Sequence, residues 1–577
     1  MNYKDTYWDW LQNPYFDAAT KEELRAIEGN ENEIKERFYM DLEFGTAGLR
    51  GIIGAGINRM NIYVVRRATQ GLANYIIKQG AANKGVAIAY DSRHMSPEFA
   101  MEAAMTLAAN GIKAYKFESL RPTPELSFAV RELGCVAGIN ITASHNPPEY
   151  NGYKVYWEDG AQFTPPHDKG VTEEVLAIED LSTVKTTDEA SATAAGLYQV
   201  IGQEIDDKYI AQVKAQVVNQ KAIDEMQDQI TIVYTPLHGT GNIPARRVMK
   251  EIGFTHVYVV PEQELPNGDF PTVSYPNPEA KEAFELGLKL AKEKDADLVL
   301  ATDPDADRLG VYVKDTKSGE YIPLTGNMSG SLLCEYVLSQ KQAAGKIPAD
   351  GQVVKSIVST NLIDAVAKSY GAELIEVLTG FKWIGKQILK NETTGHGTYL
   401  FGMEESYGCL IGTYARDKDA ISATAALCEA AAYYKQKGMT LWDAMIAMYE
   451  KYGYYKDAVK AIGLSGIEGL AKIQSIMETL RNNTPTEVGG YKVTSARDYK
   501  LDTIKNMATG EVKPTGLPSS NVLYYELTDD AWVCVRPSGT EPKVKFYYGV
   551  KGTSLADADE KSDAMGKAVL EMVDSMK

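Results

Sequence analysis

The sequence predicts an α/β protein with three related α/β domains, built on mixed or parallel sheets, and a smaller C-terminal α+β domain. One pattern of strand, loop, helix and strand recurs at 86–117, 230–260 and 353–377. The residues from 456 onward do not carry this pattern. The length of 577 residues also suggests about four domains, at a prior of roughly 150 residues each.

Each copy of the pattern opens with an apolar, β-branched run that is typical of a buried strand. A polar loop follows, and then apolar residues at three- and four-residue spacing predict a helix. A glycine ends each predicted helix, as a residue in the left-handed region does: Gly111, Gly253 and Gly371. A second strand closes each unit, and a right-handed crossover makes the two strands parallel. Copies this far apart indicate three domains rather than a solenoid.

The C-terminal part has a different pattern. Residues 522–550 are typical of strands joined by tight turns, and a helix is expected from about Ala556, which together predict an α+β domain. The stretch 483–521 is rich in Asn, Thr, Gly and Pro, and we expect it to be irregular. The expected domains are 1–205, 206–322, 323–455 and 456–577.

The chain is acidic overall, with 60 Lys and Arg against 78 Asp and Glu and a formal net charge of −18. A broad face that binds nucleic acid or an anionic membrane is therefore not expected, and any phosphate must be bound by a small local cluster of positive charge. We expect no signal peptide, because the N-terminal residues have no basic start, no apolar stretch and no small-residue cleavage site. We expect no membrane span, because no run of 18 or more apolar residues occurs. Five scattered cysteines without metal-ligand spacing predict a reduced, cytoplasmic chain.

The sharpest candidate for a site lies in ADLVLATDPDADRLGVYV (296–313). Asp303, Asp305 and Asp307 stand at alternate positions between two apolar strands, where three carboxylates would repel one another unless a cation lay among them. Hard oxygen ligands suit Mg²⁺ or Ca²⁺. An EF-hand is excluded, because its sixth and twelfth positions hold Arg308 and Lys314 rather than Gly and Glu. The alternative is a solvated acidic turn.

A second candidate is the end of the predicted strand in CVAGINITASHNPPEYNGYKVYW (135–157). Ser144 lies just past this strand, where functional residues of α/β proteins often lie, and the adjacent His145 could orient the loop or move a proton. The surroundings do not match the G-x-S-x-G motif, so no hydrolase triad is predicted. Taken alone, such a serine is more often structural.

Three further loops offer signals that are weaker when each is taken alone. The turn in WVCVRPSGTEPKVKFYYG (532–549) could be an anion-binding nest or a plain hairpin. Its candidate phosphate-binding residues are Arg536, Ser538, Gly539 and Thr540. Glu404 and Ser406 could hydrogen-bond sugar hydroxyls or simply be solvated, and a Gly-rich turn around Arg50 could approach a ligand. Dinucleotide and P-loop fingerprints are absent from the sequence.

Five segments together resemble the α-D-phosphohexomutase family: FGTAGLRG, TASHNPPEYNGYKVY, DPDADRLG, GMEESYG and RPSGTEP, in the family's order from residue 44 to residue 542. TASHNP together with DPDADR is highly specific, and the resemblance covers nearly the whole chain. It implies the four-domain, heart-shaped phosphohexomutase architecture, in agreement with the recurring pattern. One departure is Met403, where relatives often show G-E-E-S, and we align Glu404 with the first acid of the E-x-S pair.

The resemblance also implies roles for individual residues. Ser144 is expected to carry the catalytic phosphoryl group, and an oxygen of that phosphoserine to complete a Mg²⁺ site. The Mg²⁺ ligands that it implies are Asp303, Asp305 and Asp307. The further catalytic residues that it implies are Arg50, His145 and Lys418. The substrate-binding residues that it implies are Arg308, Thr379, Gly380, Lys382, Glu404 and Ser406, with Arg536, Ser538, Gly539 and Thr540 at the non-reacting phosphate.

The implied reaction is the interconversion of glucose 1-phosphate and glucose 6-phosphate, an isomerisation through a phosphoserine enzyme and glucose 1,6-bisphosphate, which also serves as activator. Mannose or pentose phosphates are alternative substrates within the family, and a metal-dependent phosphatase is a less favoured alternative outside it. The general base is left open between Lys418 and His145. The expected partners are small sugar phosphates, without nucleic acid or membrane, and the oligomeric state is left open.

Overall fold

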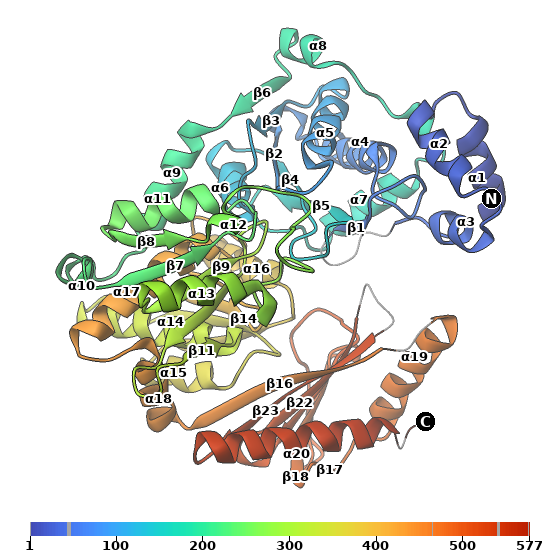
Figure 1. The fold of residues 1–577 in the computed structure, drawn as a ribbon. Coiled ribbons are helices and arrows are strands. Elements are labelled where there is room, and N and C mark those ends of the chain that lie inside the picture. The colour runs from blue at the N-terminus through green and yellow to red at the C-terminus, as the bar shows by residue number, and fades with distance from the viewer. Residues whose placement is uncertain (1, 43–47, 464–465, 539–542, 575, 577) are drawn as a thin grey trace. The chain divides into compact units, whose positions relative to one another are not determined.

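The computed structural model describes the chain except for Met1, residues 43–47, 464–465 and 539–542, Ser575 and Lys577. The described residues form four β-sheets (Figure 1). They divide into two compact units. The first unit comprises residues 1–325, 381–396 and 406–440, and the second comprises 326–380, 397–405 and 441–577. Segments of the third predicted domain therefore fall in both units.

The first sheet of the first unit has the strand order β1-β5-β4-β2-β3-β6. Strands β2, β3, β4 and β6 are parallel, whereas β5 is antiparallel to β4 and β1 is antiparallel to β5. Helix α5 joins β2 to β3, which confirms the strand–helix–strand unit predicted at 86–117. The strands are Leu49–Ile52 (β1), Val86–Tyr90 (β2), Ala114–Phe117 (β3), Ala137–Ile141 (β4), Tyr150–Trp157 (β5) and Tyr198–Ile201 (β6). The main helices of this part are Ile62–Lys78 (α4), Ser96–Ala109 (α5), Thr123–Glu132 (α6) and His167–Leu176 (α7).

The second sheet of the first unit has the order β11-β10-β9-β7-β8, with β7, β8 and β9 parallel and β10 antiparallel to β9. Helix α11 joins β7 to β8, which confirms the second predicted unit. The strands are Thr231–Thr235 (β7), His256–Val259 (β8), Leu298–Thr302 (β9), Leu309–Lys314 (β10) and Tyr321–Leu324 (β11). The helices around it are Gln203–Lys214 (α9), Gln220–Met226 (α10), Asn242–Ile252 (α11), Glu285–Lys294 (α13) and Ala420–Gln436 (α17).

The two sheets repeat one local arrangement. In each, the parallel strand that follows the strand–helix–strand unit turns back through a loop into an antiparallel neighbour, β4 into β5 and β9 into β10. The first of these loops carries Ser144 and the second carries Asp303, Asp305 and Asp307. The same topology therefore presents both candidate sites at the carboxyl end of an inner strand.

Three short helices precede this pattern, Tyr3–Gln12 (α1), Ala18–Ala26 (α2) and Glu31–Phe38 (α3). Their aromatic residues form a separate buried cluster that includes Tyr63 of α4. Trp10 stacks on Phe16 with ring centres 4.2 Å apart. Such a cluster buries much apolar surface per residue, and this burial stabilises the packing of the helical segment against α4.

In the second unit, β12 (Gly351–Ser356) is parallel to β13 (Glu373–Val377) on one side and to β14 (Thr398–Glu404) on the other. Helix α15 (Leu362–Ser369) joins β12 to β13, which confirms the third predicted unit. Helices α14 (Gly326–Ala343) and α18 (Leu441–Tyr452) pack beside α15. The strand order β13-β12-β14 matches β3-β2-β4 and β8-β7-β9, so the three units are topologically equivalent.

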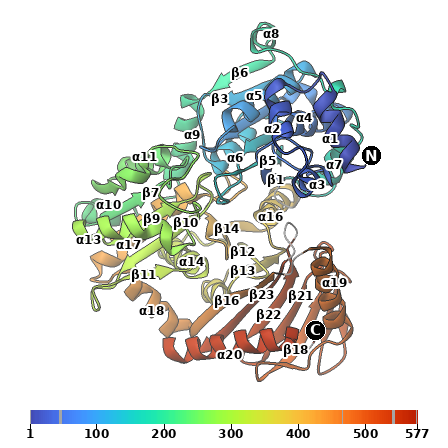
Figure 2. The same ribbon diagram turned by 45° about the vertical axis from the view of Figure 1, so that its right-hand side comes forward.

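The C-terminal part of the second unit is an antiparallel sheet in the order β16-β23-β22-β21-β18-β19-β20. Figure 2 shows helices α19 (Gly466–Asn482) and α20 (Leu555–Asp574) beside its strands, and apolar residues of both helices share one core with the sheet. The longer strands are Tyr454–Gly463 (β16), Tyr491–Asp498 (β18), Leu523–Leu527 (β21), Trp532–Pro537 (β22) and Lys543–Gly552 (β23). The predicted α+β class is confirmed.

The prediction that 483–521 is irregular was wrong. This stretch contains β18 and the short strands Glu487–Val488 (β17), Thr503–Asn506 (β19) and Val512–Lys513 (β20). Its turn-forming composition fits the tight connections, but pairing of β18 with β21 across the sheet supplies the hydrogen bonds that local propensity does not reveal. Among the described residues, no helix combines the length and apolar composition needed to cross a bilayer.

Helices α4 and α7 approach each other closely at Gly71. A Cβ atom added there would lie 2.3 Å from Val175 Cγ2 and 2.7 Å from the Val175 backbone nitrogen. Such a contact requires the two helix backbones to separate, because a backbone atom cannot rotate out of the way. Gly71 thus sets the spacing of the layer that covers the first sheet.

We expect Gly71→Ala to destabilise the protein although alanine is the better helix former. Overpacking of this kind costs about 1–3 kcal/mol, which outweighs the roughly 1 kcal/mol gained in helix propensity. Scanning calorimetry should show the unfolding transition at a lower temperature. Lys78→Ala on the same helix changes an exposed ion pair with Glu174 and should leave the transition nearly unchanged. An unchanged or higher transition for Gly71→Ala would contradict the packing argument.

Candidate active site

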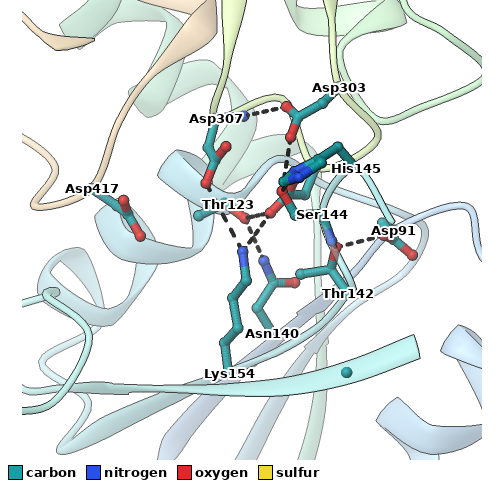
Figure 3. A network of polar contacts seen from close by, with 12 residues as sticks. Asp91, Thr123, Asn140, Thr142, Ser144, His145, Lys154, Asp303, Asp307 and Asp417 are labelled. Atoms are coloured by element: carbon teal, nitrogen blue, oxygen red, sulfur yellow. Dashed lines mark hydrogen bonds and ion pairs between the residues drawn. The ribbon is translucent and has the colours of Figure 1, made fainter. Parts of the chain in front are cut away.

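Ser144 lies on the loop between β4 and β5, with only 3% of its surface exposed. Its backbone is in the left-handed region, at a φ of 52°, which for a residue other than glycine stores roughly 1–3 kcal/mol of strain. Its hydroxyl donates a hydrogen bond to Asp303 Oδ2 at 3.0 Å and lies 3.2 Å from His145 Nδ1 (Figure 3). The structure thus brings together the two sharpest candidates of the sequence.

Asp303, Asp305 and Asp307 follow β9 and are all buried. One carboxylate oxygen from each lies within 4.8 Å of the others, an arrangement that could hold a metal ion. The backbone N–H groups of Asp307 and Arg308 donate to Asp303 Oδ1 at 3.2 and 3.1 Å. The Oδ1 atoms of Asp305 and Asp307 have no hydrogen-bond partner among the described residues. A buried carboxylate oxygen without a hydrogen bond is unfavourable, and a bound cation would satisfy it.

The electrostatics of the three aspartates lead to the same conclusion. Burial, reinforced by Asp305 and then Asp307, raises the pKa of Asp303 well above its usual value. Burial and the charge of Asp305 also raise the pKa of Asp307. Burial opposes ionisation of Asp305 as well, but Lys154 holds the pKa of that carboxyl well below its usual range. A divalent cation would offset this repulsion, and a donor set made only of carboxylate oxygens fits Mg²⁺.

Two lysines face the aspartates. Lys154 on β5 places Nζ 2.8 Å from Asp305 Oδ2 and 3.9 Å from Asp307 Oδ2. Lys418 Nζ lies 3.2 Å from Asp307 Oδ2 and 3.1 Å from Asp417 Oδ1. Lys418 was among the predicted residues, whereas Lys154 was missed. The sequence could have revealed Lys154, because it lies within the apolar strand segment NGYKVYW, and a charged residue in a buried strand needs a partner of opposite charge.

Positive charge also gathers at the Ser144 loop. Arg50 on β1 donates from Nη1 to Asn146 Oδ1 at 2.9 Å. Burial, followed by repulsion from Arg308, lowers the pKa of Arg50 to about 10, so the guanidinium remains charged at neutral pH. Burial, with Arg308 and Arg50, lowers the pKa of His145 well below its usual value, so this ring is neutral. These arginines form the kind of local cluster that an acidic protein needs in order to bind a phosphate.

The loop of Asp305 is also held by two residues that the sequence analysis missed, one on helix α6 and one on strand β4. Thr123, the first residue of α6, donates from Oγ1 to Asp305 Oδ2 at 2.7 Å and from its backbone N–H to Asp305 O at 2.9 Å. Asn140 Nδ2 donates to Thr123 Oγ1 at 2.6 Å (Figure 3). These bonds orient the carboxylate of Asp305, as residues behind a metal ligand commonly do.

Three other predicted residues of the first unit are Arg308, Lys382 and Ser406. Arg308 stays at the aspartates, with Nε 3.8 Å from Asp307 Oδ1, and forms an ion pair with Glu279 at 2.7 Å. Lys382 lies at the start of helix α16 (Phe381–Thr394), with Nζ 5.6 Å from the ring centre of Trp383, and burial lowers its pKa. Ser406 lies in the turn before β15 (Gly408–Leu410). No hydrogen bond or ion pair described for Lys382 or Ser406 joins them to Ser144 or the aspartates.

In the second unit, the predicted Thr379-Gly380 segment meets Glu404. The backbone N–H of Gly380 donates to Glu404 Oε1 at 2.6 Å. Oγ1 of Thr379 is buried and has no hydrogen-bond partner among the described residues. The next acid, Glu405, was not predicted. It accepts a hydrogen bond from Ser356 Oγ at 3.0 Å, and burial followed by the charge of Glu404 raises its pKa to about 7.

The predicted phosphate-binding turn lies between β22 and β23. Arg536 is within β22, opposite Lys545 of β23. The backbone N–H of Ser538 donates to the Lys543 carbonyl at 2.8 Å, which closes the base of the turn. Gly539 and Thr540 lie outside the described residues. Arg536 lowers the energy of ionised Glu405, which counteracts part of the pKa rise that burial and Glu404 cause there.

Comparison with known proteins matches four consecutive family domains to the chain. They are the phosphoglucomutase/phosphomannomutase alpha/beta/alpha domains I (residues 41–182), II (207–319) and III (325–452) and the C-terminal domain (506–563). A phosphoglucomutase of Staphylococcus saprophyticus is 34% identical over 562 residues, which cover 96% of this chain and 98% of the relative. A phosphoglucomutase of Staphylococcus aureus is 36% identical over 534 residues, with 92% and 94% covered.

Solved structures share the fold. Parafusin, a phosphoglucomutase from Paramecium described in an open form, is similar with a TM-score of 0.68 at 19% identity, over 93% of this chain and 95% of that one. A phosphoglucomutase/phosphomannomutase family protein from Burkholderia thailandensis gives a TM-score of 0.64 at 20% identity, over 92% and 97%. The family domains cover most of the sequence, in the order that the three equivalent α/β units and the C-terminal sheet require. The chain therefore belongs to the phosphoglucomutase/phosphomannomutase family.

Proposed function

We propose that this protein is a phosphoglucomutase, which interconverts glucose 1-phosphate and glucose 6-phosphate through a phosphoserine at Ser144. The observation that carries the proposal is the buried Ser144 hydroxyl, 3.0 Å from a carboxylate of the three-aspartate cluster. An intramolecular phosphotransferase needs such a phosphoryl acceptor beside a cation site. Curated relatives along almost the whole chain are phosphoglucomutases, which supports glucose as the sugar.

The phosphoryl group on Ser144 Oγ passes to the hydroxyl of the bound sugar monophosphate. The bond between phosphorus and Oγ breaks, a bond from phosphorus to the sugar oxygen forms, and the hydroxyl proton leaves to a base. The product, glucose 1,6-bisphosphate, then returns its other phosphoryl group to Ser144. Such a transfer depends chiefly on alignment and on neutralisation of charge.

The chain's own residues supply both requirements around Ser144. Arg50 and Arg308 provide positive charge for the phosphoryl oxygens. Neutral His145, with Nδ1 3.2 Å from Ser144 Oγ, is placed to take or return the serine proton. Lys154 pairs with Asp305 and Lys418 with Asp307, which offsets the charge of these two carboxylates beside the serine.

We assign Mg²⁺ to Asp303, Asp305 and Asp307, together with an oxygen of the phosphoserine at Ser144. When bound, this ion offsets the negative charge that the transferring phosphoryl group brings. The Oδ1 atoms of Asp305 and Asp307 support the assignment, because each is a buried acceptor that receives no hydrogen bond from the described residues.

For the rest of the substrate we propose two groups of residues. The sugar is bound by Thr379, Gly380, Lys382, Glu404 and Ser406, and the non-reacting phosphate by Arg536, Ser538, Gly539 and Thr540. The hydrogen bond from Gly380 N–H orients Glu404 for this task. We also place the enzyme in the cytoplasm, since its five cysteines are buried as thiols, which suits a reducing compartment.

Ser144→Ala removes the oxygen that accepts the phosphoryl group. We expect mutase activity to fall by roughly 10³-fold or more while the circular dichroism spectrum and melting temperature are retained. Mass spectrometry of the wild-type tryptic peptide that contains Ser144 should show a phosphoryl group on part of the molecules. Ser119→Ala changes an exposed serine away from the cluster and should keep full activity. Activity of Ser144→Ala within tenfold of wild type would refute the role.

Removal of divalent cations should abolish activity, and Mg²⁺ should restore it. We expect Asp307→Asn to weaken Mg²⁺ binding by roughly tenfold to a hundredfold or more, because it removes a charged ligand from a buried site. Titration calorimetry with Mg²⁺ measures the affinity without turnover. Asp295→Asn alters an exposed carboxylate paired with Lys314 and serves as the matched control. Equal affinities of the two variants would place the metal elsewhere.

The sugar preference is tested by an activity panel with the 1-phosphates of glucose, mannose, N-acetylglucosamine and ribose, in the presence of Mg²⁺ and the matching bisphosphate. We expect the highest kcat/KM with glucose 1-phosphate. A preference for mannose or ribose 1-phosphate would keep the mutase chemistry and overturn the sugar assignment. Release of inorganic phosphate at the rate of sugar turnover would instead indicate a phosphatase.

A further inference from the structure

We propose that Asp91, Arg93 and Thr142 form a positioning unit that holds Ser144 in the backbone conformation required for phosphoryl transfer. The inference rests on the proposed role of Ser144 as the phosphoryl carrier. None of the three residues was singled out by the sequence analysis, although Asp91 and Arg93 lie within three residues of the end of β2 and Thr142 immediately follows β4.

Both backbone polar groups of Ser144 are bound by this unit. The N–H of Ser144 donates to Thr142 Oγ1 at 2.9 Å, and the Thr142 hydroxyl donates in turn to Asp91 Oδ2 at 2.6 Å (Figure 3). The carbonyl of Ser144 accepts from Arg93 Nη2 at 2.6 Å. These groups belong to the two peptide units on either side of the Ser144 Cα, so neither unit can rotate without the loss of a buried hydrogen bond.

Arg93 also fixes the remainder of the loop. Its Nη2 donates to the carbonyl of Asn146 at 2.5 Å, and its Nη1 donates to those of Pro147 and Tyr150 at 2.8 and 3.0 Å. The side chain is fully buried, and its Nε lies 3.3 Å from Asp91 Oδ2. One guanidinium therefore binds four carbonyl groups between Ser144 and Tyr150 and holds them near the end of β2. A lysine could not replace it, because an ammonium group lacks the planar, fixed arrangement of five N–H donors.

The bonds matter for the reaction because Ser144 is strained. A φ of 52° is unfavourable for serine and persists only when the surroundings impose it. In this conformation the hydroxyl points to Asp303 Oδ2. A relaxed backbone would move Oγ away from the aspartates, and displacements of about 1 Å can lower a rate by roughly a hundredfold.

Asp91 has a second set of contacts that provides a control. Its Oδ1 accepts from Ser96 Oγ at 3.0 Å and from the Arg93 backbone N–H at 3.0 Å. Ser96 begins helix α5, is fully buried, and makes no described hydrogen bond to the 142–147 segment. Thr142→Val and Ser96→Ala thus each remove one buried hydroxyl donor from the same carboxylate, but only the first releases the Ser144 N–H.

The test compares Thr142→Val, Thr142→Ser and Ser96→Ala in the full-length enzyme with glucose 1-phosphate, Mg²⁺ and glucose 1,6-bisphosphate. We expect Thr142→Val to lower kcat by roughly tenfold to a hundredfold with KM within about twofold of wild type, because substrate contacts are untouched. Thr142→Ser keeps the hydroxyl and should restore kcat to within about threefold of wild type. Ser96→Ala should lose a similar amount of thermal stability and keep kcat within about twofold.

A second measurement follows the chemical step alone. Enzyme labelled with ³²P on Ser144 is mixed with glucose 1-phosphate in a single turnover, and the loss of label from the protein is timed. Thr142→Val should lose its label more slowly than wild type by the same factor as its kcat. An unchanged rate in Thr142→Val, or an equal loss of kcat in Ser96→Ala at equal stability, would overturn the proposal.

Failure of the proposed function looks different in the same experiments. If the wild-type enzyme neither carried label on Ser144 nor turned over glucose 1-phosphate, the function would be wrong irrespective of the variants. If the wild-type enzyme is active and labelled, the ratio of variant to wild type tests the positioning unit by itself.

Discussion

The repulsion among three buried carboxylates is the constraint around which the site is built. Asp303, Asp305 and Asp307 follow one strand and are closed off from water, so their charge has to be offset by neighbours. Lys154 and Lys418 do this from two different segments, and backbone N–H groups do it at Asp303. The carboxylate oxygens that remain without a hydrogen bond among the described residues are those that a divalent cation would take, and the buried hydroxyl of Ser144 lies beside them.

Topology explains why the serine and the aspartates meet. Each lies on the loop by which a parallel strand turns back into an antiparallel neighbour, and the two sheets of the first unit repeat that arrangement. A loop of this kind is short and anchored at both ends, which makes it a firm support for a reactive group. Thr123, which accepts a hydrogen bond from Asn140, adds further fixation at Asp305. Arg93 and Thr142 do the same at the backbone of Ser144, and Asp91 accepts from Thr142. The strain at Ser144 is maintained by these contacts rather than by the loop sequence alone.

Sequence reasoning succeeded where the chemistry is local and failed where it depends on pairing. Alternate aspartates after an apolar strand predicted a cation site, and the structure brings their carboxylate oxygens within 4.8 Å of one another, where they could hold a metal ion. The three strand–helix–strand units were recognised from periodicity. The strand β18 was missed, because its hydrogen bonds go to β21 and its own composition favours turns. Lys154, Arg93 and Thr123 were missed because each has ordinary neighbours in the sequence, and its partner lies far along the chain.

The sequence by itself determined the fold class, the three equivalent α/β units and the family, and it predicted which residues supply charge and the nucleophile. These follow from patterns spanning a few residues, such as strand periodicity and the TASHNP and DPDADR motifs. Only the tertiary structure decided that Ser144 is buried, strained and 3.0 Å from Asp303. It also decided which lysine side chains offset the charge of the aspartates. Burial and charge compensation depend on groups separated by more than a hundred residues of chain, as Lys154 and Asp305 are, and no local pattern encodes that proximity.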